Sequence, residues 1–359
     1  MRVLIVDTCY PAFLASHYES NPGLEQRPYD EQWRALMDTF FGTADSYSHY
    51  LGELGHDAHE VVVNAEPLQR AWAREHGRSP SLLRRLRRRA GSDLVLAQAE
   101  RFEPDVVYVQ HIGFLPPETM AGLKARTRLL VGQIASEAPG AEHFQHLDLV
   151  LTSFPHYVSR FRREGIASEY LRIGFDPRVL DRLDNTEPPH DVAFVGALGR
   201  LQHAQGNDVL ERAAERVPIE FWGYNLGDRP PTSPFVRRYH GEAWGLGMLD
   251  VLASARIAVN RHIDVAEDNA NNMRLYEGTG VGSLLLTDAK QNLGELFDVS
   301  REVIAYRDED ELVEAVEHFL AHEDERAAVA AAGQRRTLRE HTYEVRMREL
   351  ADILDAYLR

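Results

Sequence analysis

Residues 272–288 read NMRLYEGTGVGSLLLTD, and this stretch contains the signals of a helix that leads into a buried strand. Asn272 is a good N-cap, because its side-chain oxygen can accept a backbone N–H of the first helical turn. Gly280 ends the helical pattern, and the apolar run Leu284–Thr287 after it has the length of a buried strand. A similar run, Arg256–Asn260, precedes the helix. The region therefore predicts a strand, a loop, a helix and a second strand in succession.

The alternation of short apolar runs with helical patterns continues over the whole chain, which predicts an α/β fold with parallel sheets. The runs are continuous in apolar residues, as in strands that helices cover on both faces. In the first half the expected strands are Val3–Asp7, Glu60–Val63, Val106–Val109, Leu129–Ile134 and Leu147–Thr152. In the second half they are Asp191–Gly196, Ile219–Gly223, Arg256–Asn260, Leu284–Thr287 and Val303–Tyr306.

Three helical patterns carry specific expectations. Glu31–Leu54 is predicted as one long helix that Gly55 closes. Residues 323–341 are predicted as helical with a break at Gly333. Tyr343–Leu358 has apolar residues at helical spacing, so one face of this last helix must be buried.

The length of 359 residues fits two domains, each with its own sheet. The best linker candidate contains two adjacent prolines, Pro188 and Pro189, among polar neighbours. Because open α/β sheets bind ligands at the carboxyl ends of their strands, a cleft between the two domains is the expected site. We expect an N-terminal domain at 1–175, a linker at 176–190, a C-terminal domain at 191–341 and a final helix at 342–359.

Composition excludes several classes of protein. The formal charge of −16 argues against nucleic acid as the main partner, because phosphate neutralisation requires clustered lysine and arginine. No apolar run is long enough for a membrane span, and the strand Val3–Asp7 begins too early for a signal peptide. Cys9 is the one cysteine, which excludes an intrachain disulfide and favours a reducing compartment, so a cytoplasmic location is expected. The basic run Leu82–Arg89 could contact an anionic membrane surface, but a solvated helix face is the favoured interpretation.

The residues around the predicted helix 272–280 suit a bound diphosphate. The N-terminus of a helix presents backbone N–H groups and a partial positive charge. Arg274 adds a planar cation in the first turn, and Glu277 lies one turn further, where a carboxylate can accept two hydrogen bonds from a ribose diol. An ordinary capped helix with a solvated Arg274 and Glu277 accounts for the same spacing, so the spacing alone leaves both interpretations open.

The segments Asn272–Gly282 and Leu284–Asp288 resemble the signature of CgeB-like glycosyltransferases, which are relatives of the large family-4 group of retaining enzymes. The segments Phe194–Gly196, Tyr239–Gly245, Ala332–Arg336 and Glu340–Tyr343 also resemble this family. The resemblance implies the GT-B fold, in which two Rossmann-like domains face each other across a cleft and the C-terminal helix crosses back to the N-terminal domain. It implies a hexosyltransferase-type enzyme of carbohydrate biosynthesis, which moves a sugar with retention from a UDP-, GDP- or dTDP-sugar to an unidentified acceptor. It implies no metal and no other cofactor.

The resemblance also assigns roles on the donor side. Glu277 corresponds to the family's glutamate that binds the donor ribose. Asn269 stands where the first glutamate of the same motif is expected, which makes it a catalytic candidate, and the neighbouring Glu267 is the alternative residue for holding the transferred sugar. Gly196 and Arg200 follow the first strand of the second domain, where the family holds the diphosphate, and Arg274 can replace the lysine that is absent there. The further donor-side candidates are Tyr224, His262, Asn271, Asn272 and Met273.

On the acceptor side, His111 follows the strand Val106–Val109 and resembles the family-4 histidine that contacts the donor sugar, so it is the second catalytic candidate. Tyr10 and Tyr18 follow the first strand and could border the acceptor. Residues 308–310 match the D-x-D metal motif of the other glycosyltransferase fold, but acidic residues are expected at the start of a helix. We therefore expect no metal site.

Two other classes of function stay open. A nucleotide-sugar epimerase or hydrolase would use the same kind of cleft and needs further carboxylates near His111, for which Glu118 and Glu137 are the candidates. A non-catalytic regulator would bind a nucleotide sugar without turnover, and the replacement of the first motif glutamate by Asn269 is consistent with it.

Overall fold

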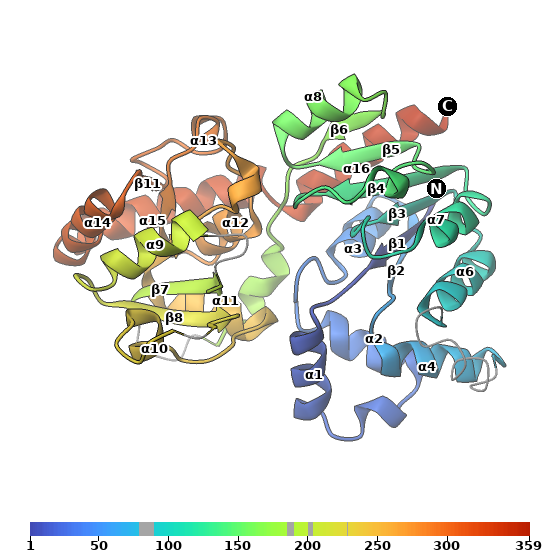
Figure 1. Cartoon of the computed structure of the whole chain (residues 1–359), viewed down its shortest axis with the longest axis horizontal. Helices are drawn as coiled ribbons and strands as arrows, with labels where there is room; N and C mark the ends of the chain where they lie inside the picture. The colour runs from blue at the N-terminus through green and yellow to red at the C-terminus, as the bar shows by residue number, and fades with distance from the viewer. Residues whose placement is uncertain (79–89, 185–189, 200–203, 228) are drawn as a thin grey trace. The chain divides into compact units, whose positions relative to one another are not determined.

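The computed structural model describes residues 1–78, 90–184, 190–199, 204–227 and 229–359. The chain divides into two compact units, residues 1–171 with 347–359 and residues 172–346 (Figure 1). Each unit contains one parallel sheet with helices, so the predicted α/β class is confirmed. Residues 176–184 of the expected linker belong to the second unit, whereas residues 185–189 and the basic run Leu82–Arg89 lie outside the described residues.

The sheet of the first unit has the strand order β2-β1-β3-β4-β5-β6, with all neighbours parallel. The sequence predicted every strand of this sheet except β6, a three-residue edge strand with polar side chains. One face of the sheet packs against α6 (Ala90–Phe102) and α7 (Pro117–Lys124), with Val95 and Met120 in the shared core. The strands are β1 (Arg2–Asp7), β2 (Asp57–Val62), β3 (Val106–Val109), β4 (Leu129–Ile134), β5 (Leu149–Thr152) and β6 (Ser168–Tyr170).

The prediction of one helix over Glu31–Leu54 is wrong, because the chain leaves the helical conformation between α2 and α3. Phe40, Gly42 and Ala44 have φ angles of 51°, 65° and 43°, in the left-handed region that a right-handed helix excludes. The other helical elements of the first unit are α1 (Pro11–Ser20), η1 (Leu24–Gln26), α2 (Tyr29–Met37), α3 (Ser46–Glu53), α4 (Glu66–Glu75), η2 (Ala141–His143), α8 (Pro155–Arg163) and, from Met347 on, α16 (Tyr343–Leu358).

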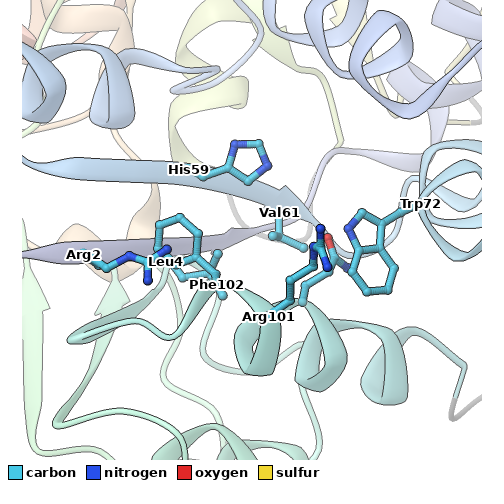
Figure 2. A pocket seen from close by; sticks show the side chains of 8 residues that line it. Arg2, Leu4, His59, Val61, Trp72, Arg101 and Phe102 are labelled. Atoms are coloured by element: carbon cyan, nitrogen blue, oxygen red, sulfur yellow. The ribbon is translucent and has the colours of Figure 1, made fainter. Parts of the chain in front are cut away.

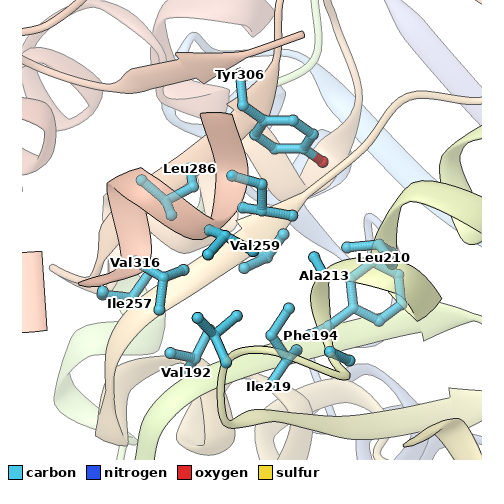
Figure 3. Close-up of a cluster of buried hydrophobic side chains, with 14 of the residues drawn as sticks. Val192, Phe194, Leu210, Ala213, Ile219, Ile257, Val259, Leu286, Tyr306 and Val316 are labelled. Atoms are coloured by element: carbon cyan, nitrogen blue, oxygen red, sulfur yellow. The ribbon is translucent and has the colours of Figure 1, made fainter. Parts of the chain in front are cut away.

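The sheet of the second unit has the strand order β11-β10-β9-β7-β8, again with all neighbours parallel. All its strands were predicted, because each is a continuous apolar run. Figure 3 shows how alternate side chains such as Val192 and Ile257 form one core with Leu210 and Val316 of the covering helices. The strands are β7 (His190–Ala197), β8 (Ile219–Tyr224), β9 (Ala255–Asn260), β10 (Leu284–Asp288) and β11 (Ile304–Tyr306).

The helix α15 is continuous through Gly333, so the predicted break at this residue is wrong. A Cβ atom at position 333 would lie 2.3 Å from the carbonyl oxygen of Glu302, so the glycine permits a close approach of the helix to its neighbour. The helical elements of the second unit are η3 (Pro177–Asp181), α9 (Ala204–Ala213), α10 (Pro234–Arg237), α11 (Gly245–Ser254), η4 (Asp264–Ala266), α12 (Met273–Gly280), α13 (Leu293–Leu296), α14 (Glu309–Ala321) and α15 (Glu323–Glu340).

The two segments in which the chain passes from one unit to the other are joined to each other within the second unit. The backbone N–H of Phe175 donates to the carbonyl of His341 at 2.8 Å, and the N–H of Tyr343 donates to the carbonyl of Phe175 at 2.9 Å. The buried guanidinium of Arg346 adds a bond from Nε to the carbonyl of Ile173 at 3.2 Å. The start of α16 is therefore anchored in the second unit before the helix continues into the first.

A buried carboxyl group in β2 makes the stability of the first unit depend on pH. Glu60 accepts hydrogen bonds from the backbone N–H of Ser48 at 2.8 Å and from its hydroxyl at 2.5 Å, beneath α3. Burial raises the pKa of Glu60 to about 8, against an ordinary value of 4.5. Between these two values the folded protein holds a proton that the unfolded chain releases, so the free energy of unfolding falls as the pH rises through this window.

We expect Glu60→Gln to reduce the loss of thermal stability between pH 5 and pH 8, because glutamine keeps a hydrogen-bonding oxygen and has no proton to release. Melting curves by circular dichroism at the two pH values provide the measurement. Glu53→Gln, at an exposed position of α3, is the matched control. Equal pH dependence in the wild type and in Glu60→Gln would contradict the assignment of the buried proton to Glu60.

Candidate functional site

The carboxyl ends of β9 and β10 meet the N-terminus of α12 in the second unit. Asn260 ends β9 and donates from Nδ2 to Thr287 Oγ1 on β10 at 2.9 Å, while Asn272 Nδ2 donates to Asn260 Oδ1 at 2.8 Å. The side chain of Asn272 accepts the N–H of Leu275 at 3.2 Å, so the predicted N-cap is confirmed. These bonds hold the first-turn N–H groups of α12 at the edge where parallel sheets bind ligands.

His262 and Asp288 form a buried pair at the same edge. Asp288 Oδ1 accepts the backbone N–H of His262 at 3.0 Å and lies 2.6 Å from its Nδ1. Lys290 Nζ lies 3.3 Å from Asp288 Oδ2. Burial alone would raise the pKa of Asp288, but the hydrogen bond and charge of His262, together with Lys290, lower it below its ordinary value. The other ring nitrogen, His262 Nε2, is buried and has no hydrogen-bond partner among the described residues, so it can bind a ligand atom.

Arg261 places a buried cation between β9 and the start of α9. It donates from Nη2 to the carbonyl of Ala197 at the end of β7, and its guanidinium lies 5.2 Å from the ring centroid of Phe194. A Cβ atom at Gly206, in the first turn of α9, would lie 2.5 Å from Arg261 Cδ, so the side chain passes directly beside that turn. Burial lowers the pKa of Arg261 to about 10, which still leaves a cation at neutral pH. Within the described ranges its Nε has no hydrogen-bond partner.

Arg274 and Glu277 form a second buried pair, on α12 itself. Arg274 Nη1 lies 2.8 Å from Glu277 Oε2, as an ion pair whose N–H groups do not point at the carboxylate. Arg274 Nε donates to the carbonyl of Val195 at 3.2 Å, and Nη2 donates to Met248 Sδ at 2.9 Å. Burial raises the pKa of Glu277, and the charge of Arg274 opposes this shift. All three nitrogens of Arg274 therefore face protein groups, and its first role is to hold Glu277.

Two partly exposed aromatic rings lie at the carboxyl end of β8. Tyr224 stacks on Trp244 with 5.3 Å between ring centroids and 26° between planes. A stacked pair of this kind presents an apolar aromatic surface. Trp222, two residues earlier, is buried and stacks on His240 at 4.4 Å, so it belongs to the core. A Cβ atom at Gly223 would lie 1.8 Å from the carbonyl oxygen of Gly196, so these glycines let β7 and β8 meet closely.

The loop between β9 and α12 carries the remaining donor-side candidates. Asn269 is buried and donates from Nδ2 to the carbonyl of Ala266 at 3.3 Å. Asn271 is buried and accepts the hydroxyl of Tyr276 at 2.8 Å. Met273 is the first residue of α12 and is partly exposed. Asn269 and Asn271 thus shape the loop, whereas Met273 lies at the helix terminus beside Asn272. Arg200 lies outside the described residues.

The candidates of the first unit lie near the carboxyl ends of β1 and β3. His111 is exposed, and its Nδ1 lies 3.1 Å from Thr8 Oγ1, which links the two strand ends. Partial burial lowers the pKa of His111. Tyr10 is 51% exposed, whereas Tyr18 donates its hydroxyl to Gln32 at 3.1 Å in the contact between α1 and α2. His111 and Tyr10 therefore face solvent at neighbouring loops, and Tyr18 is engaged in packing.

The sequence analysis did not identify three residues of the candidate site in the second unit. Arg261 and Asp288 stand at the ends of β9 and β10, and Lys290 follows two residues later. The signal that could have found them is their position, because the first polar residues after parallel strands gather at one sheet edge.

Two cavities lie away from these residues. The first unit contains a cavity of about 220 Å³, with Phe102 beside the start of β1 and Trp72 beside Val61 near the end of β2 (Figure 2). A cavity of about 540 Å³ in the second unit is lined by polar groups of α9 and the segment 230–234. Among the described residues there is no cluster of three or more His, Cys, Asp or Glu side chains arranged to hold a metal. Within the same ranges, no helix combines the length and the apolar character that crossing a bilayer requires.

Comparison with known proteins identifies a matching family model and solved structures with a similar fold. Residues 204–352 match a family model described as glycosyl transferase-like. Similar solved structures include a glycosyltransferase from Rickettsia africae (TM-score 0.59, 10% identity, 100% of this chain and 98% of the other). They also include sucrose-phosphate synthase from Thermosynechococcus elongatus (0.59, 11%, 99% and 98%) and Anabaena HepE solved with UDP-glucose (0.59, 12%, 99% and 100%). No curated protein matches the chain. The chain has the GT-B fold, and its second unit contains a glycosyl transferase-like region.

Proposed function

We propose that the protein is a glycosyltransferase, which moves a sugar from a nucleoside diphosphate sugar to a hydroxyl group of an acceptor. The match of residues 204–352 to the glycosyl transferase-like family and the UDP-glucose bound by HepE support this proposal. On the basis of the sequence resemblance to CgeB-like enzymes, we further propose that the enzyme is a hexosyltransferase that retains the anomeric configuration. We also propose that it acts in carbohydrate biosynthesis in the cytoplasm.

The observation that carries the proposal is that a buried guanidinium, a buried imidazole and two helix N-termini lie at one edge of the second sheet. Arg261 lies beside the first turn of α9, and His262 lies before the N-terminus of α12 with a buried Nε2 that has no hydrogen-bond partner among the described residues. A leaving diphosphate needs donors that are already oriented when its charge develops, and these groups are fixed by the fold. We propose that Arg261 and the helix N-termini take the role that a metal has in other transferases, and that no metal is required.

The remaining roles follow from position. Glu277 is proposed to accept the ribose hydroxyls, and Tyr224 with Trp244 to receive the base. Asn269 of the second unit is proposed to contact the transferred sugar, and His111 of the first unit is proposed as the second catalytic residue. In the reaction, the bond from the anomeric carbon to the diphosphate oxygen breaks and a bond to the acceptor oxygen forms. The acceptor proton leaves to a diphosphate oxygen.

The test is a thermal-shift screen of the full chain against UDP, GDP, dTDP, ADP and CMP, with and without EDTA. A ligand that binds only the folded protein raises the apparent stability, by about 2.7 kcal/mol at a hundred times its Kd. A rise with one diphosphate that EDTA leaves intact supports a metal-independent donor site. No shift with any nucleotide, in a folded sample, contradicts the proposal.

We expect Glu277→Gln and Arg274→Ala to weaken binding of that nucleotide by about tenfold, through loss of the ribose acceptor and of the residue that holds it. Isothermal titration calorimetry measures the effect. Glu314→Gln, at an exposed position of α14, is the control. Unchanged affinity in both variants would remove Glu277 from the donor site.

A further inference from the structure

An aromatic surface lies beside His111 in the first unit and consists of Tyr10, Phe41 and Phe114. Tyr10 is 51% exposed and Phe114 is 44% exposed. Among the described residues, the other large apolar side chains with comparable exposure are Leu54 and Tyr357. Two of the four thus gather around one loop cluster, where single exposed apolar residues would be expected to scatter.

The aromatic surface is rigidly built, because three chain segments are joined beneath it. Thr8 Oγ1 lies 3.1 Å from His111 Nδ1, which links the loops after β1 and β3. Gln110 Nε2 donates to Thr43 Oγ1 at 3.0 Å, which adds the segment between α2 and α3.

Contacts between aromatic rings also hold these side chains in place. Tyr10 meets Phe41 edge to face at 5.5 Å, and Phe41 in turn stacks on Phe13 at 3.9 Å. His111 lies 6.0 Å from Phe114. Exposed rings that are held in this way can bind a partner with little loss of side-chain entropy.

The side-chain charges around the aromatic surface disfavour an anionic partner. The loops at this sheet edge, residues 8–10, 38–45, 63–65, 110–116, 135–140 and 153–154, contain no lysine or arginine, and neither does α1. They contain Asp38, Asp45 and Glu137 instead. Arginine and lysine side chains commonly bind phosphate and carboxylate groups, and these loops contain three carboxylates in their place, so we expect an acceptor with an anionic group to bind less well here.

We propose that the aromatic surface binds the acceptor and that the acceptor is an uncharged glycoside, whose pyranose ring stacks on Tyr10 or Phe114. The C–H groups on one face of a pyranose carry partial positive charge, which the electron-rich face of an aromatic ring attracts. The neighbouring side chains of Thr8, Gln110 and His111 can form hydrogen bonds with the hydroxyl groups of the sugar. This assignment of the acceptor class rests on the proposed glycosyltransferase function.

The experiment is saturation-transfer NMR on the full chain with methyl β-D-glucopyranoside, cellobiose, glucose 1-phosphate and glucose 6-phosphate. We expect transfer to the ring protons of the two neutral glycosides and at least fivefold less to the phosphates. The variants Tyr10→Ala, Phe114→Ala and the double variant should lose at least fivefold of the signal. Tyr357→Ala, exposed elsewhere on the same unit, should lose none.

Nucleotide thermal shifts on the same samples separate this inference from the proposed function. Stronger binding of the phosphates, an undiminished signal in the folded double variant, or no binding of either neutral glycoside would overturn the acceptor assignment, even where nucleotide binding persists. Absence of any nucleotide shift would instead contradict the donor site, whatever the glycosides do.

Discussion

Replacing Arg261 with methionine is expected to weaken binding of the nucleoside diphosphate by about 10- to 100-fold. The side chain lies between the end of β7 and the first turn of α9, and its Nε has no hydrogen-bond partner in the part of the chain that the structure describes. One charge-assisted hydrogen bond contributes about 1.5–3 kcal/mol, which corresponds to this range of affinity. The loss should exceed that in Arg274→Ala, because the guanidinium of Arg274 already faces Glu277 and Val195. Isothermal titration calorimetry with the nucleotide selected by thermal shift measures both.

Methionine is the suitable replacement because it fills most of the buried volume and carries no charge. Arg216→Met is the matched control, since Arg216 is an exposed arginine of the same unit that pairs with Asp310. Arg261→Lys keeps the charge without the planar group and should show an intermediate affinity. An Arg261→Met variant that melts like the wild type and binds the nucleotide equally well would exclude Arg261 from the diphosphate site.

The second unit was the more predictable part of the fold, because its strands are continuous apolar runs. In the first unit the prediction of one helix over Glu31–Leu54 failed at Phe40 and Ala44, because local preference does not predict a left-handed backbone at non-glycine residues. The prediction at Gly333 was wrong in the opposite sense, because a helix break was expected and the helix is continuous. The role of Gly333 is to admit the carbonyl of Glu302, and a contact between α15 and a distant segment leaves no local signal.

Prediction of the candidate site from sequence was limited in the same way, because contacts between distant segments leave no local signal. Asn272 could be recognised as an N-cap because a cap depends on neighbours within one helical turn. The pair of His262 and Asp288 depends on the register of β9 against β10, and the residues are 26 positions apart. Arg261 reaches the end of β7, 64 positions away. Sequence could place these residues at one sheet edge, but their partners follow only from the strand order.

The largest effect on stability is expected for Arg346→Met, at the point where α16 leaves the second unit. Arg346 is fully buried and donates to the carbonyl of Ile173 at 3.2 Å and to the carbonyl of Glu340 at 2.8 Å. Its Nη2 also lies 3.1 Å from Nδ1 of His341. Burial, with the charge of Arg346 as a further cause, lowers the pKa of His341 to about 4, so the ring is neutral at pH 7 and this nitrogen can accept. The ring's other nitrogen, Nε2, then donates to the carbonyl of Leu296 at 2.8 Å.

Removal of the guanidinium leaves these buried acceptors without a donor, at about 1–3 kcal/mol each, so we expect a total loss of about 3–5 kcal/mol. For a unit of this size that corresponds to a fall in Tm on the order of 10 °C by differential scanning calorimetry. Arg348→Met, two residues further along α16 at an exposed position, should change the Tm by no more than about 2 °C. A fall equally small in Arg346→Met would mean that the bonds between residues 173–175 and 340–346 do not depend on this cation, and that the backbone pairing of Phe175 with His341 and Tyr343 holds the start of α16 alone.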